Sequence, residues 1–294
     1  MKIVSILRLL RLKQWFKNVF IFLPLFFNGQ FMNLSLLQDC LIAFFSFSFA
    51  ASSIYCFNDV FDVQVDRQHP QKCKRPVALG AISITGAYIV MAICLALSVS
   101  LILIFGNETK YIVLGLILFY YVLNIAYTVI LKHFPIIDVM IISIGFVLRV
   151  VVGGIVTNIY LSEWIIIMTF LLALFLAFAK RRDDVVLYQN TGVVPRRNTN
   201  RYNLDFINQV LSVISAVTII AYIMYTLSSD VMERFNSRYV YFTSIFVIAG
   251  IIRYLQITIV ELKSSNPTEI LFHDRFIQFC ILGWIVSFLI IIYF

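Results

Sequence analysis

The dominant feature of the sequence is a series of nine apolar runs, interrupted by short polar clusters. Most of the runs approach the ~20 residues that an α-helix needs to cross the hydrocarbon core of a bilayer. Hydrophobic residues make up 61% of the chain and charged residues 13%, whereas soluble domains are about half apolar and a quarter charged. A soluble fold of this size could not bury so much apolar surface, so we expect an all-α, polytopic membrane protein.

The polar clusters set the expected helix boundaries. The predicted spans are 15–32, 36–57, 83–105, 110–131, 136–157, 163–180, 206–228, 238–261 and 276–294. Ser35 and Gln38 have the spacing of a capping box before the second span, and Pro135 suits the first turn of the fifth. We expect residues 1–294 to form a single transmembrane catalytic domain. Its polar cap would consist of the cytoplasmic loops 58–82, 180–205 and 262–275.

Basic residues are distributed unevenly between the two ends of these spans. With the amino terminus inside, 18 of the 23 Lys and Arg lie on cytoplasmic segments, and only Lys110, Arg234 and Arg238 lie on the opposite side. Cytoplasmic loops of membrane proteins carry such an excess, so we expect a cell-membrane protein with a cytoplasmic amino terminus. Because this asymmetry accounts for most of the net charge of +8, the charge does not indicate a nucleic-acid partner. The five cysteines lack CxxC spacing and lie mostly in apolar runs, which indicates small buried side chains.

Three aspartates follow one another at the cytoplasmic end of the second span. Asp59, Asp62 and Asp66 are separated by three and four residues, so a continuing helix would place them on one face. Adjacent carboxylates repel each other, and a divalent cation removes that cost. Oxygen ligands suit Mg²⁺, which typically binds one or two carboxylates together with substrate phosphates. The sequence therefore predicts a Mg²⁺ site here, and the alternative is a solvated acidic helix end neutralised by the basic residues of 72–75.

Two further polar features lie on or beside the spans. Lys180, Arg181 and Asp184 stand at the expected end of the sixth span, where the ordinary interpretation is a cationic anchor. Beside the aspartates, the same residues gain a second interpretation as a phosphate-binding group. Arg149 lies inside a span, where a charge is costly and usually faces a cavity or a bundle interior. Asp138 is about 16 Å away along the axis, so we expect a bound anion or a carboxylate of a neighbouring helix as the partner of Arg149.

Three smaller features complete the pattern. Gly153 and Gly154 lie one turn beyond Arg149 and permit close approach of another helix. Arg253 also lies inside a span, and either a ligand or an interhelical hydrogen-bond network without a ligand would explain it. The segment 266–272 has an Asn cap followed by Pro and Glu, which predicts a short cytoplasmic helix.

The run 58–66 resembles the first motif of the UbiA superfamily of intramembrane prenyltransferases, Asn-Asp-x-x-Asp-x-x-x-Asp, at all four positions. The resemblance implies that superfamily's fold, with about nine helices around a central cavity open to the cytoplasmic side. The superfamily's second motif, Asp-x-x-x-Asp after the sixth helix, is not matched, because Leu187 and Tyr188 stand four residues beyond Asp183 and Asp184. This departure argues against an ordinary prenyl-diphosphate donor.

The departure matches one branch, which the chain resembles along nearly its whole length: the decaprenyl-phosphate phosphoribosyltransferases. Segments similar to this branch lie at 14–18, 69–76, 131–138, 149–154 and 180–184. The resemblance implies Mg²⁺-dependent transfer of 5-phosphoribosyl from phosphoribosyl diphosphate to a long-chain polyprenyl phosphate, with release of diphosphate and with an active site on the cytoplasmic side. The partners implied are these two substrates and membrane lipid, and a homo-oligomer is left open.

The resemblance also implies which residues carry the reaction. It assigns catalysis and Mg²⁺ binding to Asp59, Asp62 and Asp66. It assigns substrate binding to Lys17, Asn18, Asn58, Lys72, Arg75, Tyr127, Lys132, Arg149, Lys180, Arg181 and Asp184. From the residues alone, Trp15 and Lys17 have a simpler interpretation as an interface tryptophan beside a snorkelling lysine.

Two other functions remain open at this stage. A conventional UbiA-type enzyme would move a prenyl group from prenyl diphosphate to an aromatic acceptor. A transporter or lipid flippase would place Arg149 and Arg253 along an anion path. The gathering of carboxylates at one face argues against transport, because a translocation path has polar groups along its length.

Overall fold

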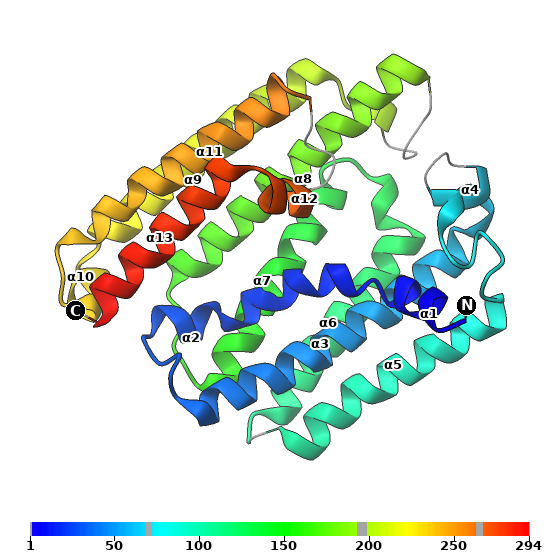
Figure 1. The fold of residues 1–294 in the computed structure, drawn as a ribbon, viewed down its shortest axis with the longest axis horizontal. Helices are drawn as coiled ribbons and strands as arrows, with labels where there is room; N and C mark the ends of the chain where they lie inside the picture. Colours follow the sequence, from blue (N-terminus) through cyan, green and yellow to red (C-terminus); the bar gives the residue numbers. More distant parts are fainter. Residues whose placement is uncertain (1, 69–71, 107, 193–198, 263–266, 294) are drawn as a thin grey trace. The chain divides into compact units, whose positions relative to one another are not determined.

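The computed structural model describes the chain except for residues 1, 69–71, 107, 193–198, 263–266 and 294. The described part is all-α, without a strand, and folds as two compact units, Met1–Leu161 (unit 1) and Ser162–Phe294 (unit 2) (Figure 1). Each unit is considered separately below. The expected polar cap draws on loops of both units and stays a prediction.

Unit 1 contains the first four long helices. Its elements are α1 (Lys2–Leu10), the 3₁₀ helix η1 (Leu12–Phe22), α2 (Leu23–Phe27), α3 (Leu34–Phe61), α4 (Val63–Gln68), η2 (Lys72–Lys74), α5 (Ile84–Phe105), α6 (Lys110–Val129), η3 (Leu131–His133) and α7 (Ile137–Thr157).

Unit 2 contains the other four. Its elements are α8 (Glu163–Thr191), η4 (Thr199–Arg201), α9 (Leu204–Leu227), α10 (Ser229–Phe235), η5 (Tyr239–Thr243), α11 (Ser244–Ile259), α12 (Pro267–His273) and α13 (Arg275–Tyr293). The predicted short helix at 266–272 is confirmed as α12, although Asn266 lies outside the described residues.

Eight helical segments of the described chain are long and apolar enough to cross a membrane. They are α3, α5, α6 and α7 in unit 1, and α8, α9, η5 with α11, and α13 in unit 2. Each coincides with one of the predicted spans from the second to the ninth. The protein is therefore an integral membrane protein.

The first apolar run does not form the continuous helix expected at 15–32. It begins as the 3₁₀ helix η1, continues as the five-residue α2, and ends where Gly29 has a positive φ of 66°. Pro24, in the first turn of α2, has no backbone N–H, so a regular α-helix cannot run through this point from η1. The apolar composition of the run alone could not reveal this break.

Three helix boundaries also differ from the predictions. Asn33, and not Ser35, caps α3, because its side chain accepts hydrogen bonds from the backbone N–H groups of residues 35 and 36. Pro135 lies just outside α7, which begins at Ile137. The helix α8 continues eleven residues beyond the expected end at 180, since no Gly or Pro interrupts it before Gly192, whose φ of 68° ends the helix.

The long helix α3 is fastened to its neighbours by buried serines. Ser46 and Ser53 donate to the backbone oxygens of Ser98 and Met91 on α5, both at 2.8 Å. Small residues allow two helices to approach closely in a membrane. Ser48 and Ser52 point to the other side, toward the α1–η1 segment. The helix α3 is therefore hydrogen-bonded to α5 on one side and to the α1–η1 segment on the other.

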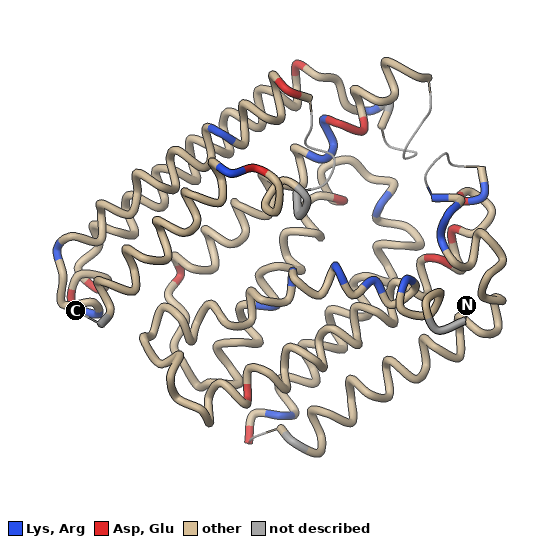
Figure 2. Tube along the Cα trace, in the orientation of Figure 1, with Lys and Arg blue, Asp and Glu red and all other residues tan. Residues whose placement is uncertain are grey.

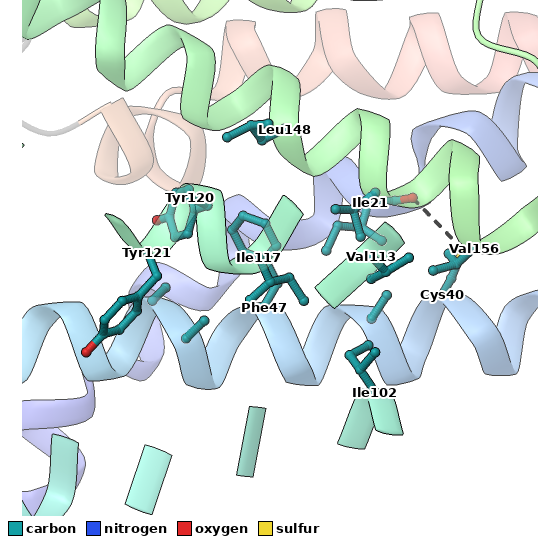
Figure 3. Packing of buried hydrophobic residues seen from close by; sticks show 14 of the residues in the cluster. Ile21, Cys40, Phe47, Ile102, Val113, Ile117, Tyr120, Tyr121, Leu148 and Val156 are labelled. Atoms are coloured by element: carbon teal, nitrogen blue, oxygen red, sulfur yellow. Dashed lines mark hydrogen bonds between the residues drawn. The ribbon is translucent and has the colours of Figure 1, made fainter. Parts of the chain in front are cut away.

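The core of unit 1 lies between α3, η1, α6 and α7. Ile21, Phe47 and Ile117 are among the fully buried side chains of this cluster (Figure 3). Gly153 makes the close contact expected of it, because a Cβ built there would lie 2.9 Å from the carbonyl carbon of Ile21 and closer still to the oxygen. The absence of a side chain at position 153 therefore lets α7 lie directly against η1.

None of the five cysteines, all of which the structure describes, forms a disulfide. Cys40, Cys56, Cys94 and Cys280 are buried, as expected for small apolar side chains, and Cys73 is half-buried in the segment after α4.

Candidate active site

The three aspartates of the first motif lie where α3 passes into α4, at an end of unit 1 where charged residues gather (Figure 2). The turn between the two helices stays close to helical, since the Asp62 N–H donates to Asn58 at 3.0 Å and the Asp66 N–H donates to Asp62 at 2.8 Å. Asp59 and Asp66 are each 2% exposed, and Asp62 is half-buried. The acidic helix end is therefore not solvated, unlike in the alternative interpretation of the motif.

Each aspartate contacts a different cation. Arg11 donates to Oδ1 of Asp59, and Arg75 Nη1 donates to Oδ2 of Asp66 at 2.6 Å while lying 3.4 Å from Oδ1 of Asp59. The Lys132 ammonium binds Oδ1 of Asp62 at 2.7 Å. The three cations therefore balance the three carboxylate charges one for one. Of the basic residues 72–75, which the alternative interpretation assigns to this task, Arg75 pairs with Asp59 and Asp66.

The Asp59 carboxylate is only half satisfied. Its Oδ1 faces two guanidinium groups, but its Oδ2 is buried and has no hydrogen-bond partner among the described residues. An orphaned buried carboxylate oxygen is costly unless a ligand completes it. Burial also raises the pKa of Asp66 above its ordinary value, with the positive charge of Arg75 opposing the shift.

This geometry bears on the expected metal. Nowhere in the described chain do three or more His, Cys, Asp or Glu side chains lie close enough together to hold a metal ion. Instead, Asp59 and Asp66 converge on the same nitrogen of Arg75, and Asp62 turns to Lys132. Two converging carboxylates and one orphaned oxygen fit Mg²⁺, which typically binds few protein carboxylates and takes its other ligands from water and substrate phosphates.

Several of the predicted substrate-binding residues lie at the same end of unit 1 as the aspartates. Asn58 is hydrogen-bonded to the hydroxyl of Thr128 on α6, and the Lys132 ammonium lies 5.2 Å from the centre of the Phe61 ring. The side chains of Lys72 and Tyr127 are half-buried. The structure therefore brings Asn58, Lys132 and Arg75 to the aspartates. His69 and Pro70 of the extended motif lie outside the described residues.

A second cationic group lies deeper in unit 1, around Arg149. The guanidinium is 5% exposed and donates to Oδ1 of Asn18 at 2.7 Å, to the Tyr120 hydroxyl at 3.2 Å and to the carbonyl oxygen of Gly145. Asn18 in turn donates to Ser48 at 2.8 Å. The expectation of a carboxylate partner is therefore wrong, because neutral amide, hydroxyl and carbonyl groups satisfy Arg149 without neutralising its charge.

Aromatic rings surround this charge. The guanidinium carbon lies 4.8 Å from the ring centre of Phe47, 5.1 Å from that of Tyr120 and 5.2 Å from that of Phe146. Lys17, on η1 next to Asn18, makes no ion pair with any carboxylate in the part of the chain that the structure describes. Two cations without a carboxylate partner among the described residues, in an apolar and aromatic setting, are an arrangement that can bind an anion.

The remaining predicted residues lie in unit 2, on α8. Arg181 is 1% exposed and pairs with Asp184 at 3.2 Å, and Lys180 is half-buried. Arg182 has a structural role, since it donates to Asn208 on α9 at 2.8 Å and to the Thr258 carbonyl oxygen on α11 at 2.6 Å. The assignment of Lys180, Arg181 and Asp184 to substrate stays a prediction.

Arg253 is held by other side chains of the protein, as in the interpretation that needs no ligand. Its guanidinium pairs with Asp274 and with Glu261, both at 2.7 Å, and so ties α11 to the start of α13. The Arg253 bonds lower the pKa of Asp274 below its ordinary value.

Arg11 is a site residue that sequence reasoning missed. By its position alone it is one of the basic residues that indicate a cytoplasmic amino terminus, and its contact with Asp59 joins residues 48 positions apart. No local pattern signals a pairing over that separation. Thr128 was missed for a similar reason, because its partner Asn58 is 70 positions away.

The chain is similar to known proteins along most of its length. A sequence model described as the UbiA prenyltransferase family matches residues 20–277. The decaprenyl-phosphate phosphoribosyltransferase of Corynebacterium glutamicum is 29% identical over 98% of this chain and 87% of its own length. The protein of the same name from Mycobacterium tuberculosis is 27% identical over 97% of this chain and 93% of its own length.

Solved structures show a similar fold. A UbiA homolog from Archaeoglobus fulgidus bound to DMAPP and Mg²⁺ has a TM-score of 0.72 at 20% identity, over 98% of this chain and 99% of that one. A structure of digeranylgeranylglyceryl phosphate synthase has a TM-score of 0.64 at 18% identity, over 98% of both chains. At such identities the likeness concerns the fold alone.

Proposed function

This chain belongs to the UbiA prenyltransferase family, and from that premise we propose that it is a phosphoribosyltransferase. It transfers 5-phosphoribosyl from phosphoribosyl diphosphate to the phosphate of a long-chain polyprenyl phosphate and releases diphosphate. The observation that carries the proposal is the match, along nearly the whole chain, to relatives named decaprenyl-phosphate phosphoribosyltransferase. The arrangement of charges in unit 1 supports it.

The reaction balances without an added oxidant or base. The bond between C1 of the ribose and the diphosphate oxygen breaks, and both electrons leave with the diphosphate. C1 then forms a bond to an oxygen of the lipid phosphate. Because that phosphate is already anionic at neutral pH, the enzyme needs no strong general base to activate the acceptor. The protein's task is to neutralise the leaving diphosphate and to position both anions.

The aspartates and their cations are the proposed diphosphate site. Asp59 and Asp66, with Asp62 as the third member, would hold Mg²⁺, which supplies charge neutralisation to the leaving diphosphate. Arg75 and Lys132 lie on these carboxylates, where they can donate to phosphate oxygens of the same ligand. Arginine suits this role because its fork of donors can bind phosphate through two hydrogen bonds.

The group around Arg149 is the proposed seat of the lipid phosphate. Arg149 and Lys17 carry two positive charges that no carboxylate of the described residues neutralises, and Phe47 and Phe146 line the guanidinium. A phosphate attached to an apolar tail matches this combination of charge and aromatic surface. Asn18 would hold the Arg149 guanidinium in place through its 2.7 Å hydrogen bond.

The donor assay tests the proposal. Purified protein in detergent would be incubated with Mg²⁺, ribose-labelled phosphoribosyl diphosphate and polyprenyl phosphate, and the label would be followed into the organic phase. We expect labelled lipid and released diphosphate, and loss of both in Asp59→Asn and Asp62→Asn with folding retained. Lys74→Gln, at an exposed position outside the ion pairs, is the matched control and should retain activity.

Two results would contradict the proposal. Label that stays water-soluble while prenyl diphosphate is consumed with an aromatic acid would make this a conventional prenyl-transferring member of the family. Flux of polyprenyl phosphate across liposomes without chemical turnover would make it a transporter. We also propose that the amino terminus and the active site face the cytoplasm, as the distribution of basic residues indicates.

A further inference from the structure

Arg11 has an unusual backbone. It lies between α1 and η1 with φ 52° and ψ 51°, the left-handed conformation that residues other than Gly, Asn and Asp rarely adopt. Such outliers persist only where surrounding contacts enforce them, and they cluster at functional sites.

The contacts that enforce this conformation are visible. Ser52 of α3, which is fully buried, donates to the carbonyl oxygen of Leu10 at 2.8 Å and accepts from the Trp15 ring nitrogen at 2.9 Å. Residues on both sides of Arg11 are therefore tied to one serine. The Trp15 ring also packs edge-on against Phe45 and Phe49 of α3. These two hydrogen bonds, which we call the Ser52 clamp, direct the Arg11 side chain along α3 toward the acidic end of that helix.

The Arg11 guanidinium uses few of its hydrogen-bond donors within the described part of the chain. Its hydrogen bond to Oδ1 of Asp59 is the only one that it makes with the described residues, and its other face lies 4.8 Å from the centre of the Tyr55 ring. Arg75 approaches the same oxygen at 3.4 Å, so Asp59 does not depend on Arg11 for a counter-ion. The Arg11 side chain is 24% exposed, which leaves most of its donors open to a ligand.

We propose that Arg11 is a diphosphate-binding residue, which the Ser52 clamp keeps paired with Asp59 until the diphosphate arrives. In the free protein it is a counter-ion of Asp59, and when a divalent cation takes that carboxylate, Arg11 transfers to a phosphate of the arriving diphosphate. The inference deepens the proposed function and rests on it for the identity of the donor. Its consequence is that divalent metal alone competes with Arg11 and binds poorly, whereas metal and diphosphate strengthen each other's binding.

Metal binding without turnover tests this exchange. Mn²⁺ would be titrated into purified protein in the absence and presence of inorganic diphosphate, and protein-bound Mn²⁺ would be measured by equilibrium dialysis, because diphosphate also chelates Mn²⁺ in free solution. In the wild type we expect diphosphate to tighten Mn²⁺ binding about tenfold or more, within the usual range of coupling between two ligands. In Arg11→Gln, Mn²⁺ alone should bind more tightly than in the wild type, and the gain from diphosphate should shrink to a few-fold.

Two further variants keep the test decisive. Arg11→Gly removes the same side chain and accepts the positive φ without strain, so it should reproduce the effect even if Arg11→Gln folds poorly. Arg8→Gln removes an exposed arginine one turn earlier on α1 and should behave as the wild type.

The direction in which loss of Arg11 changes the affinity for Mn²⁺ separates the proposal from its alternatives. If loss of Arg11 weakens Mn²⁺ binding equally with and without diphosphate, Arg11 is a positioning residue for the Asp59 carboxylate and the proposal is wrong. Unchanged binding in both variants would also overturn it. Because the probe is inorganic diphosphate, coupling lost in Arg11→Gln would support the inference even if the ribosyl transfer assay failed.

Discussion

The contact between Gly153 and η1 makes a quantitative prediction. A Cβ at position 153 would meet the carbonyl carbon of Ile21 at 2.9 Å and its Cα at 3.2 Å. Both atoms belong to the backbone, so no side-chain rotation relieves the overlap, and either α7 or η1 must move. We therefore expect Gly153→Ala to lower the free energy of unfolding.

Two other glycines calibrate the size of this effect. Overpacking of a close contact costs about 3 kcal/mol at the upper end of the usual range, and the better helix propensity of Ala returns about 1 kcal/mol, so Gly153→Ala should lose about 2 kcal/mol net. Gly115 on α6 has no atom within 4 Å of its Cβ position, so Gly115→Ala should gain about 1 kcal/mol. The three heavy atoms nearest to a Cβ at Gly154 are side-chain atoms of Leu161, at 2.7–2.8 Å. A side chain can shift, so Gly154→Ala should fall between the two.

Unfolding of the three variants in mixed detergent micelles, followed by circular dichroism during a denaturant titration, would measure this order. The same displacement of η1 would carry Lys17 and Asn18 away from Arg149, so Gly153→Ala should also raise the KM for polyprenyl phosphate. Equal stability of Gly153→Ala and Gly115→Ala would refute the reasoning, because it would mean that α7 and η1 are not in backbone contact.

Three further predictions concern other parts of the chain. Arg149→Lys keeps the charge but loses the fork to Asn18 and Tyr120, which at about 1.5–3 kcal/mol for a charged hydrogen bond should raise the KM for polyprenyl phosphate more than tenfold. The KM for the donor should not change. Arg253→Lys serves as the control, because the hydrogen bonds of Arg253 lie within unit 2. An equal rise of the KM for both substrates in Arg149→Lys would contradict a lipid-phosphate seat. Because hydrogen bonds from Arg253 lower the pKa of Asp274, the pair contributes stability above the ordinary value of 3.8 that is lost as the pH falls through the lower, folded value. Arg253→Gln should thus be less stable than the wild type at pH 6, by about 1 kcal/mol, with a gap that narrows below pH 3.8, and a gap independent of pH would show that the pair is not the cause. Cys73, as the one cysteine that is not buried, should react with a membrane-impermeant maleimide only from the cytoplasmic side, and labelling in intact cells would overturn the proposed orientation.

The sequence predicts the membrane helices well because lipid imposes a simple rule on them. Eight of the predicted spans correspond to helices long and apolar enough to cross a bilayer, and the all-α fold expected from the UbiA resemblance is confirmed. The failure at 15–32 has a local cause, since Pro24 interrupts a run whose composition is otherwise suitable. The expected end of α8 at 180 is wrong because the charged residues 180–184 continue the helix, which ends only at Gly192.

The site was predictable only in part. The helical spacing of Asp59, Asp62 and Asp66 predicts one shared face of a continuing helix, but α3 ends before Asp62, so Asp59 and Asp66 share Arg75 while Asp62 turns to Lys132. Spacing does not determine which cation each carboxylate selects. Those choices depend on contacts with Arg11 and Lys132 that span 48 and 70 positions. Arg149 illustrates the same limit, because a charge inside a span predicts a partner without specifying whether that partner is charged or neutral. Whether the site residues act on substrate stays a prediction.

The serines of α3 have a consequence for the assembly of the protein in the membrane. Their hydroxyls make α3 less apolar than α5, and their hydrogen bonds to α5 exist only after α5 has been synthesised. We therefore expect α3 to leave the insertion machinery together with α5 and not as an isolated segment. A chain truncated after α3 should integrate into microsomes less efficiently than one that extends through α5, and replacing Ser46 and Ser53 with Ala should remove most of that difference.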